Sequence, residues 1–157
     1  MFARYFVELP LSTEQVERLL TGDPETWLPG LAGKANRRGD DLLAEVGFGD
    51  TIRVARPVSI TIGRPVQAGT KIVLPLAWVP SGGVGLFPSL DADLEIGPLG
   101  QDRTQLAMSA RYSPPLKAVG RAIDRIVLFR VAEATLKDFL DGVASTLTSM
   151  EPAHEPG

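Results

Sequence analysis

The sequence predicts an α+β domain in which one antiparallel β-sheet packs against a long C-terminal helix. Three observations support this fold class. The chain has 157 residues, the length of one ordinary domain. Between 40 and 112, apolar residues alternate with period two, as in half-buried strands. From 116 to 148 the chain has no proline, and its apolar residues follow a helical period. We therefore expect a single domain over 1–148 and a disordered tail over 149–157, which is rich in proline and glutamate.

A strand and two short helices are predicted at the start. The segment FARYFVEL at 2–9 is rich in aromatic and β-branched residues, which favour a strand. Ser12 is the expected cap of the first helix, with Gln15 as its capping-box partner, and Gly22 is expected to end it. The second helix is expected to be capped by Asp23 and kept short by three residues, Pro29, Gly30 and Gly33.

Five strands with short turns are predicted next, which indicates an antiparallel meander. Pro57 and Pro75 fall within two of these strands, so each is expected at an edge or a bulge. The segment GRPVQAG at 63–69 is expected to be a turn. One strand carries alternating acidic residues that are expected to be solvated, namely Asp91, Asp93 and Glu95. The five segments are DLLAEVGF, TIRVARPVSITIG, TKIVLPLAWV, SLDADLEIG and RTQLAMSARY.

The long helix changes its apolar face along its length. Its upstream face contains Leu116, Val119, Ala122, Ile123, Ile126 and Val127. Its downstream face is turned by roughly 110° and contains Leu136, Phe139, Leu140, Val143 and Leu147. Arg130, Lys137 and Asp141 continue the upstream face, and Arg130–Glu133, Glu133–Lys137 and Lys137–Asp141 are spaced for ion pairing. Arg130 therefore has two interpretations, a member of a solvated charge ladder or a cation that enters the interior.

The composition excludes several classes of function. The chain has no cysteine, and its one histidine, His154, lies in the tail, so thiol chemistry, histidine-based triads and most zinc sites are excluded. The net charge of −3 argues against nucleic acid as a partner. The N-terminus is too short and polar for a signal peptide, and no apolar run approaches the ~20 residues of a membrane span. We expect a cytoplasmic protein with no cofactor and no metal.

The order of elements resembles that of the START-like, or helix-grip, superfamily, which includes Bet v 1-type proteins, polyketide cyclases and lipid-transport proteins. The resemblance covers residues 1 to about 148 and is carried by YFVELPLSTEQVERLL and PPLKAVGRAIDRIVLFRVAEATLKDFL. The second segment is similar to the C-terminal helix of small actinobacterial members. The resemblance implies a curved sheet wrapped around the long helix, with a hydrophobic cavity between them. Many members bind lipids, sterols or polyketides, some are enzymes, and some act as partner proteins.

The inward strand faces are compatible with such a cavity. They mix large residues with three small ones, Ala44, Ala92 and Ala110, which either leave room for a ligand or let the helix pack closely. We predict binding of a small apolar or amphipathic molecule, oriented by Arg56, Tyr112 or Arg130. Arg56 has an alternative, because a bulge before Pro57 would turn it outward. The predicted pocket walls are Leu76, Trp78, Leu94, Met108, Ile123 and Val127.

Two other functions remain open. The same cavity would suit a cyclase or aromatase in which Arg56 or Tyr112 steers a poly-β-ketone, without a metal or a covalent nucleophile. Alternatively, the loop WVPSGGVGLFPSL carries apolar residues at 83–88, including Phe87, where surface loops are usually polar. That loop is either a lid over an apolar ligand, a surface that contacts a protein or membrane, or a plug at the end of the core.

Overall fold

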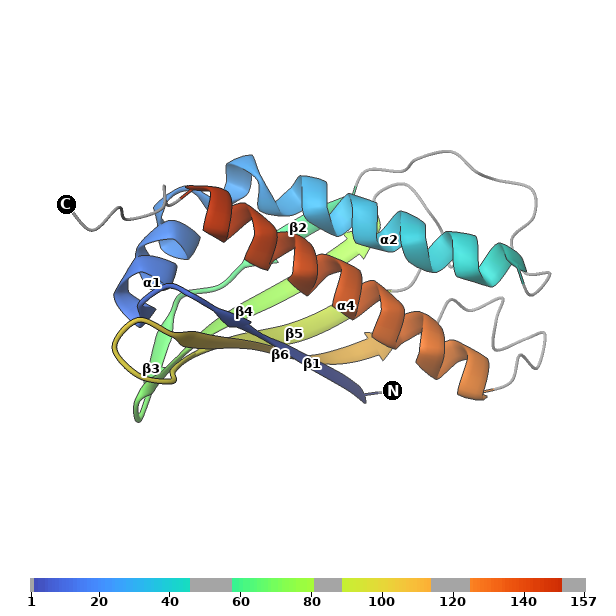
Figure 1. The fold of residues 1–157 in the computed structure, drawn as a ribbon. Helices are drawn as coiled ribbons and strands as arrows, with labels where there is room; N and C mark the ends of the chain where they lie inside the picture. The colour runs from blue at the N-terminus through green and yellow to red at the C-terminus, as the bar shows by residue number, and fades with distance from the viewer. Residues whose placement is uncertain (1, 46–57, 81–88, 114–124, 151–157) are drawn as a thin grey trace.

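The computed structural model describes residues 2–45, 58–80, 89–113 and 125–150 (Figure 1). The first part of the chain forms a strand, two helices and a 3-10 turn, and the rest forms five further strands and a long helix. The elements in chain order are β1 (Phe2–Leu9), α1 (Thr13–Gly22), η1 (Pro24–Thr26), α2 (Leu28–Glu45), β2 (Val58–Ile62), β3 (Val66–Ala68), β4 (Lys71–Pro80), β5 (Ser89–Pro98), β6 (Thr104–Ser113) and α4 (Arg125–Met150).

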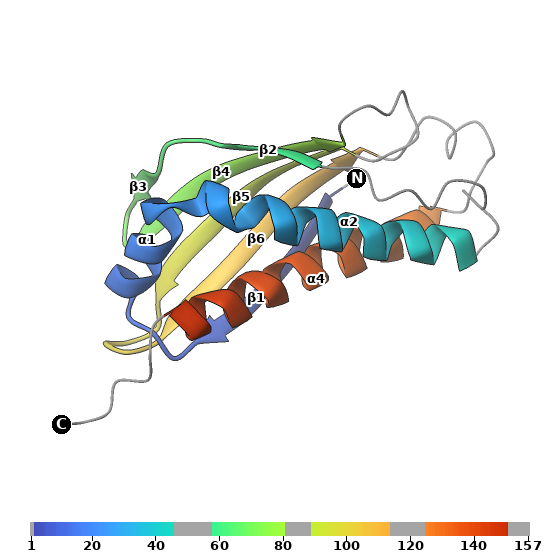
Figure 2. The ribbon, with the colours of Figure 1, turned by 90° about the horizontal axis from the view of Figure 1, so that it is seen from above.

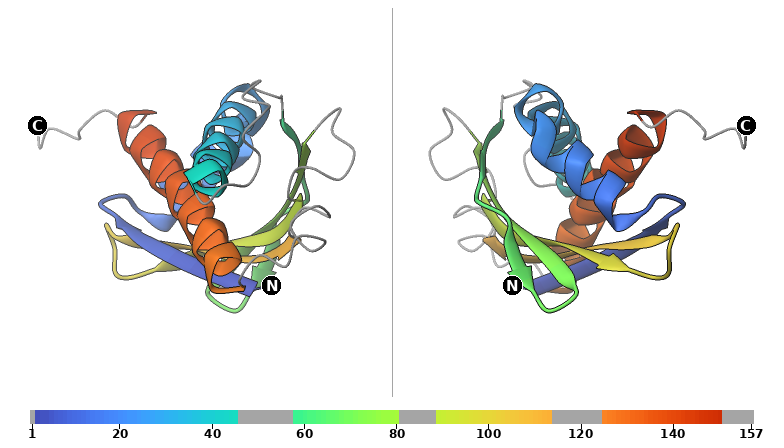
Figure 3. Two further views of the ribbon diagram at one scale, coloured as in Figure 1. Left: turned by 90° about the vertical axis from the view of Figure 1, so that its right-hand side faces the viewer. Right: turned by 90° about the vertical axis from the view of Figure 1, so that its left-hand side faces the viewer.

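The strands within these ranges form one antiparallel sheet in the order β1-β6-β5-β4-β2, with β3 also pairing with β4. The sheet is curved, and α1, α2 and α4 all lie on its concave side (Figures 2 and 3). This arrangement confirms the predicted α+β fold, with a sheet that wraps around a long C-terminal helix.

The core lies between the concave face of the sheet and the helices. Every second residue of β4, β5 and β6 points into it, as the period-two pattern predicts. On α4 the predicted downstream face is fully buried, with Leu136, Phe139, Leu140, Val143 and Leu147 all at 0% exposure. The upstream part of the predicted helix, 114–124, lies outside the described residues. At its other end α4 continues to Met150, two residues past the predicted end of the domain at 148.

The predicted start of α1 is confirmed in detail. The Ser12 hydroxyl accepts a hydrogen bond from the Gln15 backbone N–H at 3.2 Å, and the Gln15 side chain accepts one from the Ser12 N–H at 2.8 Å. This reciprocal pair satisfies two of the N–H groups that a helix start leaves without partners. Asp23 occupies the predicted N-cap position, ahead of Pro24, but it caps the 3-10 turn η1 and makes no side-chain capping bond.

The second helix is much longer than predicted, and this is the main error in the predicted fold. α2 spans Leu28–Glu45, so the segment DLLAEVGF, predicted as a strand, is helical up to Glu45. Pro29 is tolerated because it lies in the first turn, where its missing N–H has no helical partner. Leu28, Ala32 and Ala35 are fully buried at helical spacing, and this burial outweighs the propensity cost of the three glycines in α2, about 1 kcal/mol each.

Pro75 explains a break at one edge of the sheet. β2 pairs with β4 from Leu76 onwards, and β3 pairs with β4 up to Val73. Pro75 lies between these two ladders, where it has no N–H to donate, and its carbonyl accepts a hydrogen bond from the Gly63 N–H at 2.8 Å. β3, at Val66–Ala68, lies within the segment 63–69 that was predicted to be a turn. The predicted edge or bulge position of Pro75 is only partly right: β4 is an interior strand whose register with β5 has no bulge, and Pro75 lies at the gap between the ladders of β2 and β3. Pro57 lies outside the described residues.

Candidate functional site

The concave face of the sheet is built in rows of side chains that run across the strands. One row contains Tyr5, Met108, Leu94 and Leu74, which are opposite one another in the β1-β6-β5-β4 register. Two residues further along each strand, the register brings together Ala3, Ala110 and Ala92. All three alanines are buried, with exposures of 3%, 1% and 7%. We call these three residues the alanine row.

The alanine row is bordered by larger side chains. Leu76 of β4 pairs with Ala92 and continues the row, and beyond the row Trp78 pairs with Leu90. Because alanine ends at Cβ while its neighbours are leucine, methionine and tryptophan, the floor of the concave face is lowest along this row. Ala92 and Ala110, two of the three small inward residues predicted from the sequence, belong to the alanine row. The third predicted one, Ala44, lies on α2 instead.

Above this floor, α4 supplies the covering side chains. Phe139 contacts Trp78 edge to face, with ring centroids 5.0 Å apart and an interplanar angle of 69°. Val131, Ala132 and Thr135 of α4 are also buried. The helix therefore packs firmly on the sheet in its C-terminal half and presents smaller residues one to two turns earlier.

The predicted wall residues on strands lie together on this concave face. Leu76, Trp78, Leu94 and Met108 are buried, and Leu94 is directly opposite Met108 in the register. Tyr112 lies in β6 opposite Leu90, and Val127 lies in α4. Three other predicted site residues, Arg56, Phe87 and Ile123, lie outside the described residues, as does the loop segment 83–88.

Arg130 lies on the surface of the molecule. Its side chain is exposed and lines a groove of about 270 Å³ between β1 and α4, together with Arg4, Tyr5, Glu133, Ala134 and Lys137. The interpretation in which Arg130 enters the interior is therefore wrong. The reason is helical geometry: Val131 and Ala132 point to the core, and Arg130 shares the solvent face of Glu133 and Lys137.

Of the three predicted charge pairs on α4, one forms. Lys137 Nζ lies 3.0 Å from Asp141 Oδ2, whereas within the described part of the chain Glu133 is ion-paired with neither Arg130 nor Lys137. Asp141 also accepts a hydrogen bond from the Tyr5 hydroxyl at 3.1 Å, and Lys137 lies 5.9 Å from the centroid of the Tyr5 ring. Asp141 therefore joins α4 to the edge strand β1, a link that sequence spacing did not predict.

This link changes the acidity of Tyr5. Burial raises the pKa of its phenol, and the hydrogen bond to Asp141 and the negative charge of that carboxylate raise it further, against an opposing effect of Lys137. Because the folded-state pKa lies above the ordinary value, this group stabilises the fold below pH ~10, and the contribution is lost as the pH rises through the folded-state pKa. The Lys137 pKa is also raised, mainly by its hydrogen bond to Asp141.

We expect the titration of Tyr5 to show this shift directly. The chain has two tyrosines, so in a Tyr112→Phe background the phenolate absorbance reports Tyr5 alone. Its midpoint should lie above the ordinary value, and Asp141→Asn should lower it because the negative charge is removed. Tyr5→Phe should correspondingly reduce the loss of unfolding free energy above pH ~10. A midpoint at or below the ordinary value would contradict the Tyr5–Asp141 contact.

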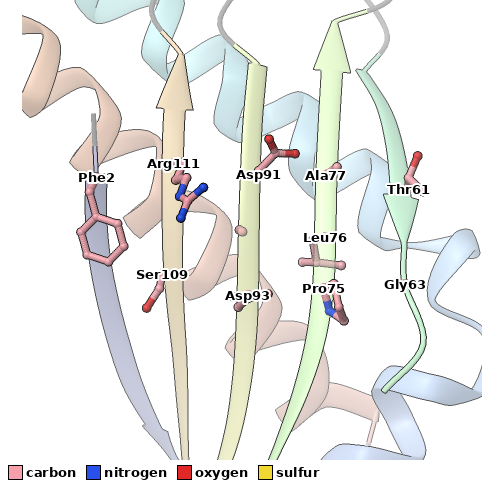
Figure 4. A pocket seen from close by; sticks show the side chains of 11 residues that line it. Phe2, Thr61, Gly63, Pro75, Leu76, Ala77, Asp91, Asp93, Ser109 and Arg111 are labelled. Atoms are coloured by element: carbon pink, nitrogen blue, oxygen red, sulfur yellow. The ribbon is translucent and has the colours of Figure 1, made fainter. Parts of the chain in front are cut away.

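The opposite face of the sheet carries a hollow of mixed polar and apolar lining that the sequence did not predict. It has a volume of about 500 Å³ and is lined by residues of five strands, β1, β6, β5, β4 and β2, as Figure 4 shows. Asp91 and Asp93 are exposed there, as predicted for solvated residues, and Arg111 is opposite Asp91 in the register. The sequence feature that could have indicated this hollow is a set of small residues that line it, namely Gly63, Pro75, Ala77 and Ser109.

Neither a metal site nor a membrane span is found in the described parts of the chain. Within them, no group of three or more His, Cys, Asp or Glu side chains is placed to share a metal ion. None of the described helices is long and apolar enough to cross a membrane.

Comparison with known proteins finds similarity at the level of structure. No protein-family model and no curated protein sequence matches the chain. A conserved protein from Geobacillus kaustophilus superposes with a TM-score of 0.51 at 15% identity, over 95% of this chain and 96% of that one. A hypothetical protein from Helicobacter pylori superposes with a TM-score of 0.50 at 12% sequence identity, over 93% of this chain and 87% of that one.

A START superfamily protein from Mycobacterium smegmatis gives 0.49 at 12% identity, over 96% of this chain and 99% of that one. Identities this low show a shared fold alone. The structure itself has the defining arrangement, a curved antiparallel sheet around a long C-terminal helix with the other helices on the same side. By its architecture, this chain therefore has the predicted α+β fold of helix-grip type.

Proposed function

We propose that the chain binds a small apolar or amphipathic molecule between the concave face of the sheet and α4. The observation that carries this proposal is the alanine row, Ala3, Ala110 and Ala92, which lies between two rows of large side chains. The three alanines are buried in this structure, so a ligand would take the place of side chains that now cover the row. The START-like fold, in which the sheet curves around the helix, supports the same location.

The driving force would be burial of apolar surface. A ligand that buries about 300 Å² of apolar area gains roughly 7 kcal/mol before the cost of association is subtracted. Leu76, Trp78, Leu94 and Met108 supply apolar surface around the row. Phe87, Ile123 and Val127 are proposed as further walls, and Arg56 and Tyr112 as the polar groups that orient the ligand. Arg130 is left out, because it is exposed in a groove outside this face.

The first test is to look for a bound molecule. Native mass spectrometry of the purified protein should show an adduct of lipid-like mass, and the fluorescent apolar probe anilinonaphthalene sulfonate should bind and be displaced by that molecule. Trp78 is buried beside the row, so in a Trp27→Phe background, where it is the one remaining tryptophan, its emission should change when the probe binds. Absence of both an adduct and probe binding would contradict the proposal.

Ala92→Leu tests the alanine row itself. The larger side chain would occupy the proposed site, so we expect probe affinity to fall by at least about tenfold, equivalent to roughly 1.4 kcal/mol. The matched control is Ala77→Leu, because Ala77 lies on the neighbouring strand and faces the outer hollow. It should leave probe affinity unchanged.

The same variant separates a ligand site from close helix packing. If α4 already fills the space above Ala92, the added leucine overpacks the core and costs about 1–3 kcal/mol of unfolding free energy. If the space is available to a ligand, the variant should unfold at nearly the wild-type denaturant midpoint. A large loss of stability with no change in probe binding would show that the alanine row serves helix packing.

A further inference from the structure

The free edge of β1 has the properties of a strand that pairs with another chain. β1 lies at one end of the sheet and pairs on its inner side with β6 over all eight residues, without a bulge. Within the described residues, no strand pairs with its other side. Exposed edge strands are often very short, or they contain a proline or a β-bulge. β1 has none of these features.

The outward side chains of β1 are unusually apolar for an edge. Phe2 and Phe6 are 59% and 55% exposed on the face opposite the helices. They alternate with Arg4 and Glu8, so the outward sequence of the strand is aromatic, basic, aromatic, acidic. Two exposed phenylalanines on one edge strand are typical of a surface that is covered in an assembly.

The lateral edge of β1 is accessible despite the neighbouring helix. α4 covers the concave side of β1, where Asp141 accepts the Tyr5 hydrogen bond. Between the strand and the helix, the groove lined by Arg4, Tyr5, Arg130, Glu133, Ala134 and Lys137 remains open. An added strand would therefore approach β1 from the side and would not have to displace α4.

We propose that β1 pairs antiparallel with β1 of a second copy of this chain, about a two-fold axis at Phe6. This register places Phe6 opposite the partner's Phe6 and Arg4 opposite the partner's Glu8. Registers centred on Tyr5 or Val7 oppose a phenylalanine to a charged residue, and one centred on Arg4 opposes two arginines. The register at Phe6 is therefore the one in which charges of opposite sign and aromatic rings match across the edge.

Each copy contributes two charges to this interface. In the monomer, Arg4 lies 3.4 Å from Glu95, and Glu8 lies 3.1 Å from Arg103; both pairs are exposed. Exposed pairs of this kind leave both charged groups accessible to a second partner. Dimerisation would add a carboxylate beside each Arg4 and a guanidinium beside each Glu8, and it would remove both phenylalanines from water in part.

Sedimentation equilibrium of the full chain tests the proposal. From about 1 μM to about 1 mM, the weight-average mass should rise from monomer towards dimer. Arg4→Glu and Glu8→Arg should each raise the dimer dissociation constant on the order of tenfold, because each variant reverses two cross-strand pairs. Phe6→Ser should also weaken the dimer. Arg37→Glu, an exposed substitution on α2, should not.

The double variant Arg4→Glu with Glu8→Arg is decisive. It should restore dimerisation, because the reversed charges again match across the axis. Within the monomer the same double change faces Glu95 and Arg103 with like charges, so a purely internal effect would be worse in the double variant than in either single one. Circular dichroism and thermal unfolding confirm that each variant is folded. A monomer at all concentrations, or a double variant as weak as the single ones, would overturn the proposal.

Discussion

Phe139→Ala is expected to lower the free energy of unfolding by about 3–5 kcal/mol, with a fall in the melting midpoint on the order of 10 °C. Phe139 is fully buried in α4, and its ring meets Trp78 of β4 at 5.0 Å in an edge-to-face contact. Its removal leaves a cavity where the long helix meets the sheet and deletes an aromatic pair worth about 0.5–1.5 kcal/mol beyond its area. Chemical denaturation followed by tryptophan fluorescence measures the effect.

Phe129→Ala is the matched control for this prediction. Phe129 lies in the same helix but is 40% exposed, so its truncation should change stability much less, by roughly 0.5 kcal/mol. If both variants lose similar stability, the burial of Phe139 described here is incorrect. If Phe139→Ala is nearly neutral, α4 does not depend on this contact for its position on the sheet.

Thr104→Val is expected to cost about 1–3 kcal/mol of unfolding free energy, although the two side chains have nearly the same shape. Thr104 is fully buried at the start of β6, and its hydroxyl donates a hydrogen bond to the Leu11 carbonyl at 2.8 Å. Leu11 lies in the connection between β1 and α1. The valine variant leaves that carbonyl without its partner in a buried site. Equilibrium unfolding in urea measures the loss.

Thr135→Val gives the comparison for that substitution. Thr135 is also buried, and its hydroxyl donates to the Val131 carbonyl at 2.8 Å one turn earlier in α4. That carbonyl lies within the helix and also accepts a backbone hydrogen bond there, so the variant leaves no group unpaired. We expect a change within about 0.5 kcal/mol. Equal effects of the two variants would show that the Thr104–Leu11 bond is not a determinant of stability.

The local patterns of the sequence predicted most of the sheet and one helix start correctly. β4, β5 and β6 begin and end within two residues of the predicted segments, because turn residues and period-two alternation are both properties of neighbouring residues. The capping box of Ser12 and Gln15 formed as predicted for the same reason. By contrast, the length of α2 was underestimated because Pro29, Gly30 and Gly33 argue locally against a helix.

The candidate site depended on information that neighbouring residues do not carry. Ala92 and Ala110 were recognised as inward-facing, but Ala3 joined them only through the pairing of β1 with β6. The exposure of Arg130 likewise depends on how α4 is rotated about its axis on the sheet. The observed rotation exposes Arg130 and brings Asp141 to Tyr5.

By itself the sequence determined the fold class, most of the strands and the buried downstream face of the long helix, because hydrophobic periodicity decides which side of an element leaves water. The tertiary structure alone decided the extent of α2, the alanine row, the outer hollow and the side of α4 on which Arg130 lies. These features depend on strand register and helix packing between residues far apart in the chain. Their energies come from burial and contacts that exist only after the elements have assembled.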